Sequence, residues 1–474
     1  MLVRQWLIEG LGHLSTMLGD DDAGTAVIVD PRRDVDVYVD EAADRDLRIT
    51  HVLETHLHND YVSGARELAA LSGAQHVIGA GADLRYEHRP ARDGDAFRSG
   101  SLEVTVLEAP GHTPEHVVYA VADAKRAGEP ALLLTGGSLL VGAVGRTDLL
   151  GVEHAVPFAH AMRETLRTAV FGQPDYVTVL PTHGAGSLCS TGIASTPSST
   201  IGYERRHNGV ARLALDDADA EAFVHALLVG QPTVPAYFAR MRPTNQAGPR
   251  PIGLAPMLPR PLEPAAVRDL AADGALVVDL RDPVEHALAH VPGSISIPAG
   301  SSFGTWLGWV VEPDRPLVLI GEERAAWQDV VRQAGRVGFE DSIVGRVRGG
   351  FEAWRAAGLR TESNGRLSVD ELAGRLAGAD APVVIDVRQE AEYDRAHVPG
   401  ALHLGAGELA ARLAEIPRDR PLVTMCASGY RASVAASLLR QAGFDDVAWV
   451  AEGVPSWRRA GFPIERTRGR PSYR

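Results

Sequence analysis

One cysteine of this 474-residue chain stands in a setting that suits nucleophilic chemistry. It opens a loop that consists of Cys426, Ala427, Ser428, Gly429, Tyr430 and Arg431. An apolar, strand-like run at 421–425 precedes the loop, and a helical pattern that ends at Gly443 follows it. Backbone N–H groups at a helix start, together with the charge of Arg431, favour a thiolate on Cys426. We therefore expect a nucleophile that can hold a persulfide, rather than a buried cysteine that acts as a small hydrophobe.

The first half of the chain contains residues that could bind a cation. Each follows an apolar, strand-like run; they are His56, His58, Asp60, His112 and His183. The pattern predicts a strand at 49–54 and a helix at about 62–71, so the first three of them lie just past a strand end. Imidazoles and a carboxylate that converge at one sheet edge indicate a metal site rather than four unrelated histidines.

The region around Cys426 is present twice, which predicts two α/β domains of the same kind. At the position of Cys426 the first copy has Gly321, followed by Glu322 and Glu323. Glycine supplies no thiol and two carboxylates would repel an anion, so we expect this copy to be a scaffold or docking surface. The matching segments are 278–281, 290–293 and 349–354 in the first copy, and 385–388, 397–400 and 452–457 in the second.

With its Cys-x4-Arg loop in register, the second copy resembles the rhodanese (sulfurtransferase) family. Related phosphatases carry a loop one residue longer, so the short loop favours sulfur over phosphate. The resemblance implies that Cys426 and Arg431 are catalytic and that residues 427–430 cradle the persulfide. It also implies small sulfur anions, such as thiosulfate and sulfite, as partners.

The first half resembles the metallo-β-lactamase superfamily, and most closely the bacterial persulfide dioxygenases that are fused to rhodanese domains. The runs at 64–66, 144–149, 183–189 and 200–204 carry this resemblance. It implies an α/β chain with an N-terminal αββα sandwich, followed by two rhodanese-like domains with parallel sheets. It further implies oxidation of a low-molecular-weight persulfide, such as a glutathione-like thiol persulfide, by O2 at one Fe(II).

By this resemblance the iron ligands would be His56, His112 and an Asp after the strand expected at 131–134. Gly137 stands at that Asp position and has no side chain to donate. We therefore expect little iron in the protein, and expect Gly137→Asp to raise iron binding. A pocket of His56, His58 and His112 would suit zinc, with Asp60 and His183 as weak or outer ligands. Cys189 is either a sulfur relay or a packing residue beneath the loop that starts at His183.

Three functions stay open at this point. The chain could combine sulfur transfer at Cys426 with persulfide oxidation in its first half. It could instead be a sulfurtransferase whose N-terminal metal fold is catalytically degenerate. A zinc-dependent thioester hydrolase of the glyoxalase II type is the third alternative, although Tyr61 replaces a histidine that the dinuclear hydrolases use.

The expected domain boundaries follow from composition and from the repeat. They are a metallo-β-lactamase-like domain at 1–240, a Pro-rich linker at 241–261, an inactive rhodanese-like domain at 262–360, a rhodanese domain at 365–466 and a tail at 467–474.

Charge and cysteine content limit the partners and the compartment. The formal net charge of −14 argues against nucleic acid and anionic membranes as partners. Only two cysteines occur, so a disulfide framework is excluded and a reducing compartment is favoured. Because the sequence shows neither a signal-peptide pattern nor an apolar run of about 18 residues, we expect a cytoplasmic protein that does not span a membrane. A homo-oligomer is left open.

Overall fold

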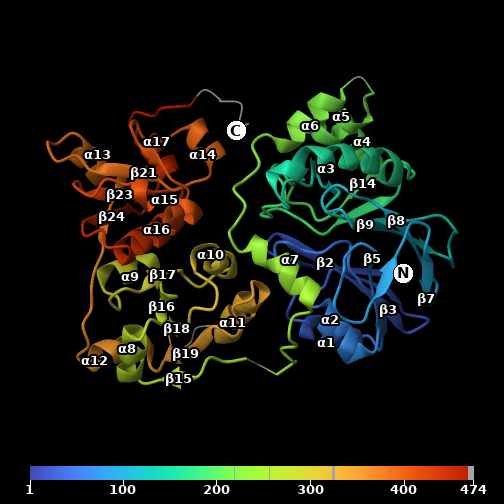
Figure 1. Ribbon diagram of the computed structural model, residues 1–474, viewed down its shortest axis with the longest axis horizontal. Coiled ribbons are helices and arrows are strands. Elements are labelled where there is room, and N and C mark those ends of the chain that lie inside the picture. Colours follow the sequence, from blue (N-terminus) through green and yellow to red (C-terminus); the bar gives the residue numbers. More distant parts are fainter. Residues whose placement is uncertain (218, 256, 323–325, 468–474) are drawn as a thin grey trace. The chain divides into compact units, whose positions relative to one another are not determined.

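The structure is a computed structural model that describes all residues except 218, 256, 323–325 and 468–474. Two compact units are present (Figure 1). The first comprises Met1–Ala255 and Gly335–Gly338, and the second comprises the described parts of Pro256–Ala334 and Phe339–Arg474. None of the described helices is both long enough and apolar enough to cross a membrane.

The first unit contains two six-stranded sheets that face each other. The first sheet has the order β1 (Leu2–Ile8), β2 (His13–Asp20), β3 (Thr25–Val29), β4 (Arg48–Leu53), β5 (Gln75–Gly79) and β6 (Arg89–Ala91). The second has the order β14 (Ser199–Thr200), β13 (Thr178–Pro181), β10 (Leu132–Gly136), β9 (Val117–Asp123), β8 (Leu102–Glu108) and β7 (Ala96–Ser99). A short hairpin, β11 (Leu139–Leu140) and β12 (Ala143–Val144), follows β10.

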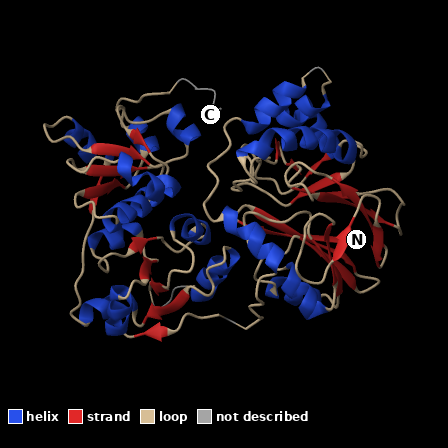
Figure 2. Cartoon of the chain, in the orientation of Figure 1, coloured by secondary structure: helices blue, strands red, loops and turns tan. Residues whose placement is uncertain are grey.

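Helices cover the outer face of each sheet (Figures 1 and 2). The first sheet is covered by α1 (Asp36–Asp44) and α2 (Ala65–Ser72). The second is covered by α3 (Val152–Thr165), the π-helical turn η1 (Leu166–Val170), α4 (Ile201–His207), α5 (Gly209–Leu215) and α6 (Ala220–Leu228). Strand β3 is apolar in all but its first residue because it is covered on both faces. This four-layer arrangement confirms the expected αββα sandwich.

The second unit contains two repeats, each with a five-stranded, all-parallel sheet of the same topology. The first sheet has the order β15 (Pro261–Leu262), β19 (Ile343–Val347), β18 (Leu317–Ile320), β16 (Leu276–Asp279) and β17 (Ile295–Ser296). The second has the order β20 (Gly365–Leu367), β24 (Val447–Val450), β23 (Leu422–Met425), β21 (Val383–Asp386) and β22 (Leu402–His403). The matching order confirms that one α/β domain type occurs twice.

Helices connect the strands of each repeat, as parallel strands require. The first repeat contains α8 (Pro264–Ala272), α9 (Pro283–Leu288), α10 (Phe303–Val310), α11 (Trp327–Arg336) and α12 (Gly350–Ala356). The second contains α13 (Val369–Leu376), α14 (Glu390–Arg395), η2 (Ala406–Glu408), α15 (Leu409–Arg412), η3 (Leu413–Glu415), α16 (Tyr430–Gln441) and α17 (Val454–Arg459).

The expected linker at 241–261 differs from the structure in its first part. Helix α7 (Phe238–Ala247) runs across the expected boundary and contains Pro243. Arg242 makes two hydrogen bonds to Glu115, and the Asn245 amide donates to the carbonyls of His58 and Tyr61. These contacts hold the segment as a helix of the first unit despite the proline. Of the expected tail at 467–474, residues 468–474 lie outside the described part of the chain.

Candidate functional sites

Cys426 lies between the end of β23 and the start of α16, as the sequence pattern predicts. Its Sγ accepts a hydrogen bond from the backbone N–H of Gly429 at 3.1 Å. The side chain is buried, with 1% of its surface exposed. The loop reverses at Gly429, whose φ of 88° is unfavourable for residues with a side chain. The sulfur therefore lies at a helix N-terminus, where N–H groups and the helix dipole favour negative charge.

Arg431 is tied to a carboxylate that the sequence analysis did not single out. Its guanidinium makes two hydrogen bonds to Glu392 of α14, at 2.6 and 2.8 Å. Burial raises the pKa of Glu392, but the bond to Arg431 outweighs burial and lowers it. Glu392 is therefore ionised at neutral pH, and the planar pair fixes the orientation of Arg431 beside the loop.

The backbone between β24 and α17 contacts the Cys426 loop directly. The N–H of Val454 donates to the carbonyl of Cys426 at 2.8 Å. A Cβ at Gly453 would lie 2.4 Å from that same carbonyl oxygen, so only glycine permits this approach.

The first repeat has the strand but not the nucleophile. Gly321 follows β18 as Cys426 follows β23, and a Cβ there would lie 3.3 Å from the Trp327 ring. Arg281 pairs with Asp279, as Arg388 pairs with Asp386 in the second repeat, and it stacks on Phe351 at 3.8 Å. Glu323, expected to help repel anions, lies outside the described residues.

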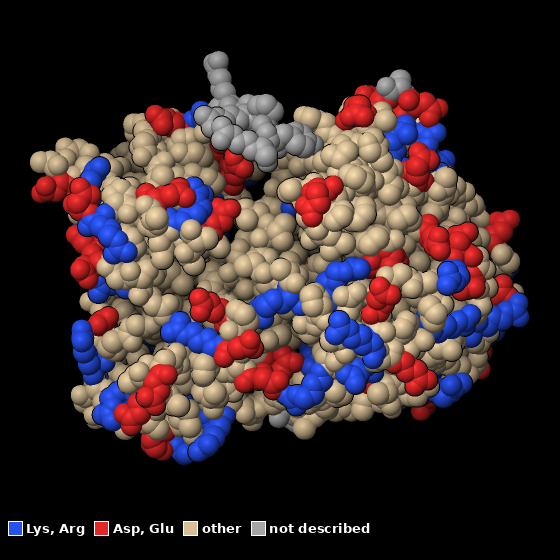
Figure 3. All heavy atoms as spheres, in the orientation of Figure 1, with Lys and Arg blue, Asp and Glu red and all other residues tan. Residues whose placement is uncertain are grey.

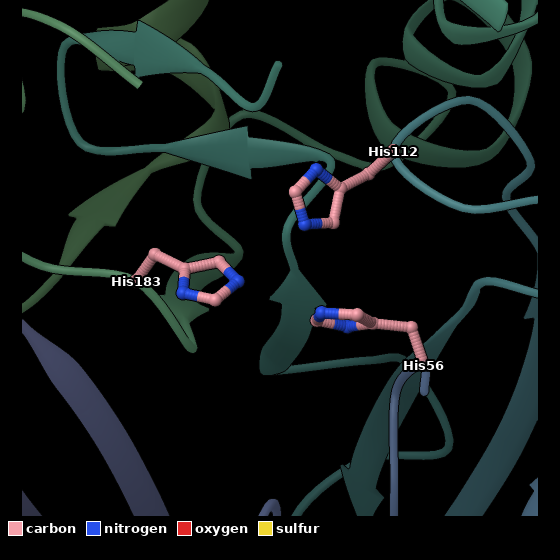
Figure 4. Close-up of side chains that lie close together, drawn as sticks. All are labelled: His56, His112 and His183. Atoms are coloured by element: carbon pink, nitrogen blue, oxygen red, sulfur yellow. The ribbon is translucent and has the colours of Figure 1, made fainter. Parts of the chain in front are cut away.

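In the first unit the structure brings together His56, His112 and His183 (Figure 4). They follow β4, β8 and β13 respectively, and one ring nitrogen from each lies within 4.8 Å of the others. All three side chains are buried. Burial lowers the pKa of His56 well below its usual value and that of His112 to about 3. Both are therefore neutral imidazoles, the form that binds metal ions.

The two nitrogens of each ring have different surroundings. Two Nδ1 atoms are engaged: that of His56 by Thr55 Oγ1 at 2.9 Å, that of His112 by the Arg146 carbonyl at 2.8 Å. The Nδ1 of His183 lies 3.4 Å from Asp60 Oδ2, an ion-pair distance, and makes no hydrogen bond among the described residues. The Nε2 atoms of all three have no hydrogen-bond partner among the described residues. Three buried ring nitrogens without hydrogen-bond partners thus lie close together, as the ligand atoms of a metal site do.

His58, expected as a ligand beside His56 and His112, points elsewhere. Its Nε2 lies 3.1 Å from Asp30 Oδ1, in a pair with no solvent exposure. Sequence reasoning missed Asp30, although its place at the end of the buried run 25–29 resembles that of the acidic residues that end β16 and β21. Tyr61 stacks on His13 with ring centroids 4.0 Å apart.

Gly137 supplies no ligand, and the space beside it is filled. A Cβ at this position would lie 2.2 Å from Cδ2 of His112. The backbone N–H of Gly137 donates to His116 Nε2 at 2.9 Å. The residues present therefore do not fit an iron site of two histidines and one aspartate.

A second group of donors shares His183. Asp60, His183 and Cys189 are all buried and offer ligand atoms within 4.8 Å of one another. Neither carboxylate oxygen of Asp60 has a hydrogen-bond partner among the described residues. This group lies on the Nδ1 side of His183 and places negative charge behind that ring.

Comparisons with known proteins find a family match for the first half of the chain and for each of the two repeats. The Metallo-beta-lactamase superfamily matches residues 8–183, and the Rhodanese-like domain matches residues 263–357 and 368–460. The human mitochondrial persulfide dioxygenase ETHE1 is 32% identical over 196 residues, which cover 39% of this chain and 68% of that protein. A sulfurtransferase of Allochromatium vinosum is 35% identical over 100 residues, which cover 21% of this chain and 94% of that protein.

One solved structure covers a larger share of the chain. A metallo-beta-lactamase from Staphylococcus aureus has a TM-score of 0.64 at 28% identity and covers 73% of this chain and 98% of its own. Fold and sites together define a metallo-β-lactamase-fold protein that carries two rhodanese-like domains. The chain belongs to the family in which a persulfide-dioxygenase-like domain is fused to rhodanese domains, and its two halves resemble proteins of sulfur metabolism.

Proposed function

We propose that the protein is a sulfurtransferase that carries sulfane sulfur on Cys426. The observation that carries this proposal is the hydrogen bond from the Gly429 N–H to Cys426 Sγ at the start of α16. The resemblance to the sulfurtransferase of Allochromatium vinosum supports it. Donors would be thiosulfate or a low-molecular-weight persulfide such as that of glutathione, and acceptors would be sulfite or a thiol.

In the first step the Cys426 thiolate attacks the outer sulfur of the donor. A new S–S bond forms to Cys426, and the donor's own bond breaks to release sulfite from thiosulfate, or a thiolate from a persulfide. The terminal sulfur of the enzyme persulfide is anionic and needs the N–H groups of the loop. In the second step an acceptor nucleophile attacks that terminal sulfur and regenerates the Cys426 thiolate.

The residues around the sulfur have separate tasks in this scheme. The N–H of Gly429 and the start of α16 stabilise the negative charge on sulfur. Arg431, oriented by Glu392, attracts anionic donors and acceptors to the loop. The first repeat has no equivalent nucleophile, so a single cysteine per chain performs the transfer.

Replacement of Cys426 tests the proposal. Cys426→Ser keeps the side-chain volume but introduces a hydroxyl that is not ionised at neutral pH, so transfer from thiosulfate to cyanide should be lost. Cys189→Ser changes the other cysteine and serves as the matched control, which should retain the transfer. Full activity of the Cys426→Ser protein would refute the proposal.

The family resemblance also implies iron and persulfide oxidation in the first half. The two-histidine, one-aspartate iron site is incomplete at Gly137, so the proposed function does not include persulfide oxidation. Sulfur transfer at Cys426 is therefore the activity that we propose for the chain.

A further inference from the structure

We propose that His56, His112 and His183 form a three-histidine metal centre, in which His183 replaces the missing aspartate and zinc is preferred over iron. This proposal does not depend on sulfur transfer at Cys426, which lies in the other unit. Its ligand set differs both from the one that the family implies and from the trio with His58 that local sequence reasoning favours.

The unpartnered nitrogens carry the proposal. The Nε2 atoms of the three rings have less than 1 Å² of accessible surface each and no hydrogen-bond partner among the described residues. Folded proteins rarely leave buried polar atoms unsatisfied, and three such atoms rarely meet at one point. A divalent cation at that point would satisfy all three at once, because an imidazole whose proton is on Nδ1 has a lone pair on Nε2.

The groups behind the rings of His56 and His112 leave their Nε2 atoms as the metal ligands, and Asp60 lies on the Nδ1 side of His183. A metal-binding histidine usually has its other nitrogen held by a carboxylate, a carbonyl or a hydroxyl, which fixes the ring orientation. Here the three Nδ1 atoms face Thr55 Oγ1, the Arg146 carbonyl and the Asp60 carboxylate. His58 also has one nitrogen held by a carboxylate, Asp30, and a buried Nδ1 without a hydrogen-bond partner among the described residues. It does not belong to the group of described residues whose ligand atoms lie within 4.8 Å of one another, so it is not one of the three ligands.

The space at Gly137 excludes the aspartate that the family uses. The ring of His112 lies where a Cβ at 137 would be, 2.2 Å from Cδ2 and 2.6 Å from Nε2. The ring cannot withdraw easily, because its Nδ1 is bonded to the Arg146 carbonyl. Glycine at 137 therefore leaves room for the His112 ring, and an aspartate there would displace a ligand. This reverses the expectation from the sequence that Gly137→Asp would raise iron binding.

The three imidazole ligands favour zinc over iron. Three imidazoles with an open fourth position match zinc sites, whereas Fe(II) in oxygen-dependent enzymes prefers two histidines and a carboxylate. Neutral nitrogen donors also bind Zn²⁺ more tightly than Fe²⁺ in the usual affinity order. The Asp60 carboxylate next to His183 supplies negative charge behind the ligand.

Metal titration of the full-length protein tests the centre. The chain would be freed of metal with a chelator and titrated with Co²⁺ as a spectroscopic probe for zinc. We expect one tetrahedral Co²⁺ per chain, displaced by Zn²⁺. His183→Gln should weaken binding by at least about 100-fold, because one of three ligands is lost. His160→Gln, which changes an exposed histidine of α3, is the matched control and should bind as the unchanged protein does.

Two further measurements keep the proposal falsifiable if a variant fails to fold. X-ray absorption of the zinc-loaded, unmodified protein should count three imidazoles, and a count of two would overturn the proposal. Gly137→Asp should lower Co²⁺ affinity by at least about tenfold because it displaces His112. Tighter Fe²⁺ binding by Gly137→Asp would show that the aspartate can join the site, and would also overturn the proposal. Sulfur transfer from thiosulfate should be unaffected in each variant, so failure here leaves the Cys426 proposal untouched.

Discussion

At the scale of single residues, Asp30 shows how this fold keeps a buried carboxylate charged. Its side chain accepts hydrogen bonds from the N–H and Oγ1 of Thr55 at 2.7 and 2.8 Å, from Thr182 Oγ1, and lies 3.1 Å from His58 Nε2. Burial raises the pKa of Asp30, but His58 and the hydrogen bonds outweigh burial and lower it to about 2. The hydrogen bonds that this carboxylate accepts therefore link the ends of β3, β4 and β13.

This lowered pKa predicts an acid-dependent loss of stability. A carboxyl whose pKa is lower in the folded state stabilises the fold above its unfolded pKa, and that contribution is lost as the pH falls towards the folded value. Asp30→Asn should destabilise the first unit by about 3 kcal/mol at neutral pH, because it breaks a buried charge pair. The difference in unfolding free energy between the unmodified protein and Asp30→Asn should become smaller by about 1 kcal/mol as the pH falls from about 5 to about 3.

Denaturant unfolding of both proteins across this pH range measures the gap. A difference that stays constant from about pH 5 to about pH 3 would contradict the assignment.

At the scale of elements, the Cys426 loop depends on a close backbone approach from the segment between β24 and α17. The N–H of Val454 bonds to the Cys426 carbonyl at 2.8 Å, and Gly453 lies against the same group. Glycine at 453 is needed for two reasons, a φ of 76° and the absence of room for a Cβ. The position of the Cys426 sulfur thus depends on the ends of β23 and β24 and on the start of α16.

Gly453→Ala should therefore reduce sulfur transfer by more than about tenfold, since the loop must move to relieve the contact. Gly443→Ala is the matched control: Gly443 has a similar φ of 81°, but a Cβ added there would have nothing within 4 Å. The control should lose about 1 kcal/mol of stability and keep its rate of transfer. Steady-state kinetics with thiosulfate and cyanide would measure both, and equal rates in the two variants would contradict the role of the close approach.

At the scale of the whole molecule, the repeat that has Gly321 packs against the repeat that has Cys426. Ser437 Oγ of α16 accepts a hydrogen bond from the Ser296 N–H at 3.0 Å, and the Tyr430 hydroxyl donates to the Pro298 carbonyl at 3.4 Å. Trp309 of α10 lies directly over Gly407 of η2, where a Cβ would be 1.9 Å from the indole Nε1. The first repeat therefore supports the helix that begins at the Cys426 loop, which is a structural use for a domain without a thiol.

This packing predicts that alanine at 407 destabilises the protein, whereas alanine at 374, a helix position with free space around it, serves as the control and should stabilise it. Gly407→Ala should destabilise the second unit by about 2 kcal/mol, because the Trp309 ring must leave its position. Gly374→Ala, in α13 with nothing within 4 Å of the new Cβ, should stabilise the protein by about 0.5–1 kcal/mol. Calorimetry of the two variants measures these shifts, and an unchanged melting temperature for Gly407→Ala would contradict the packing between the repeats.

Surface charge is mixed on the face drawn in Figure 3. Basic and acidic side chains are interspersed there, and neither sign covers a broad area of the described residues. With a net charge of −14, that face offers no extended basic region among the described residues for nucleic acid to contact. The small sulfur anions that we propose as donors and acceptors would need only the local positive potential of the Cys426 loop.

The sequence alone was sufficient for the features that depend on short, contiguous segments. The strand, loop and helix around Cys426 lie within about twenty residues, so local pattern determines that the sulfur stands at a helix start. The doubled segments predicted two domains of one kind for the same reason, and the resemblance of the first half predicted its sandwich. The first two depend on neighbours in the chain, whose geometry backbone sterics largely decide, whereas the sandwich was implied only by the family resemblance.

Only the tertiary structure shows which histidines converge and could hold a metal ion. His58 follows His56 by two residues and is the obvious second ligand by spacing, yet Asp30 from another strand end holds it. His183, from a distant strand, points its Nε2 at the common centre instead. Which ring nitrogen is free depends on the partner behind each ring, and those partners are brought together only when the two sheets pack. The room that Gly137 leaves for His112 is likewise a property of packing, because sequence shows a missing side chain but not what fills its place.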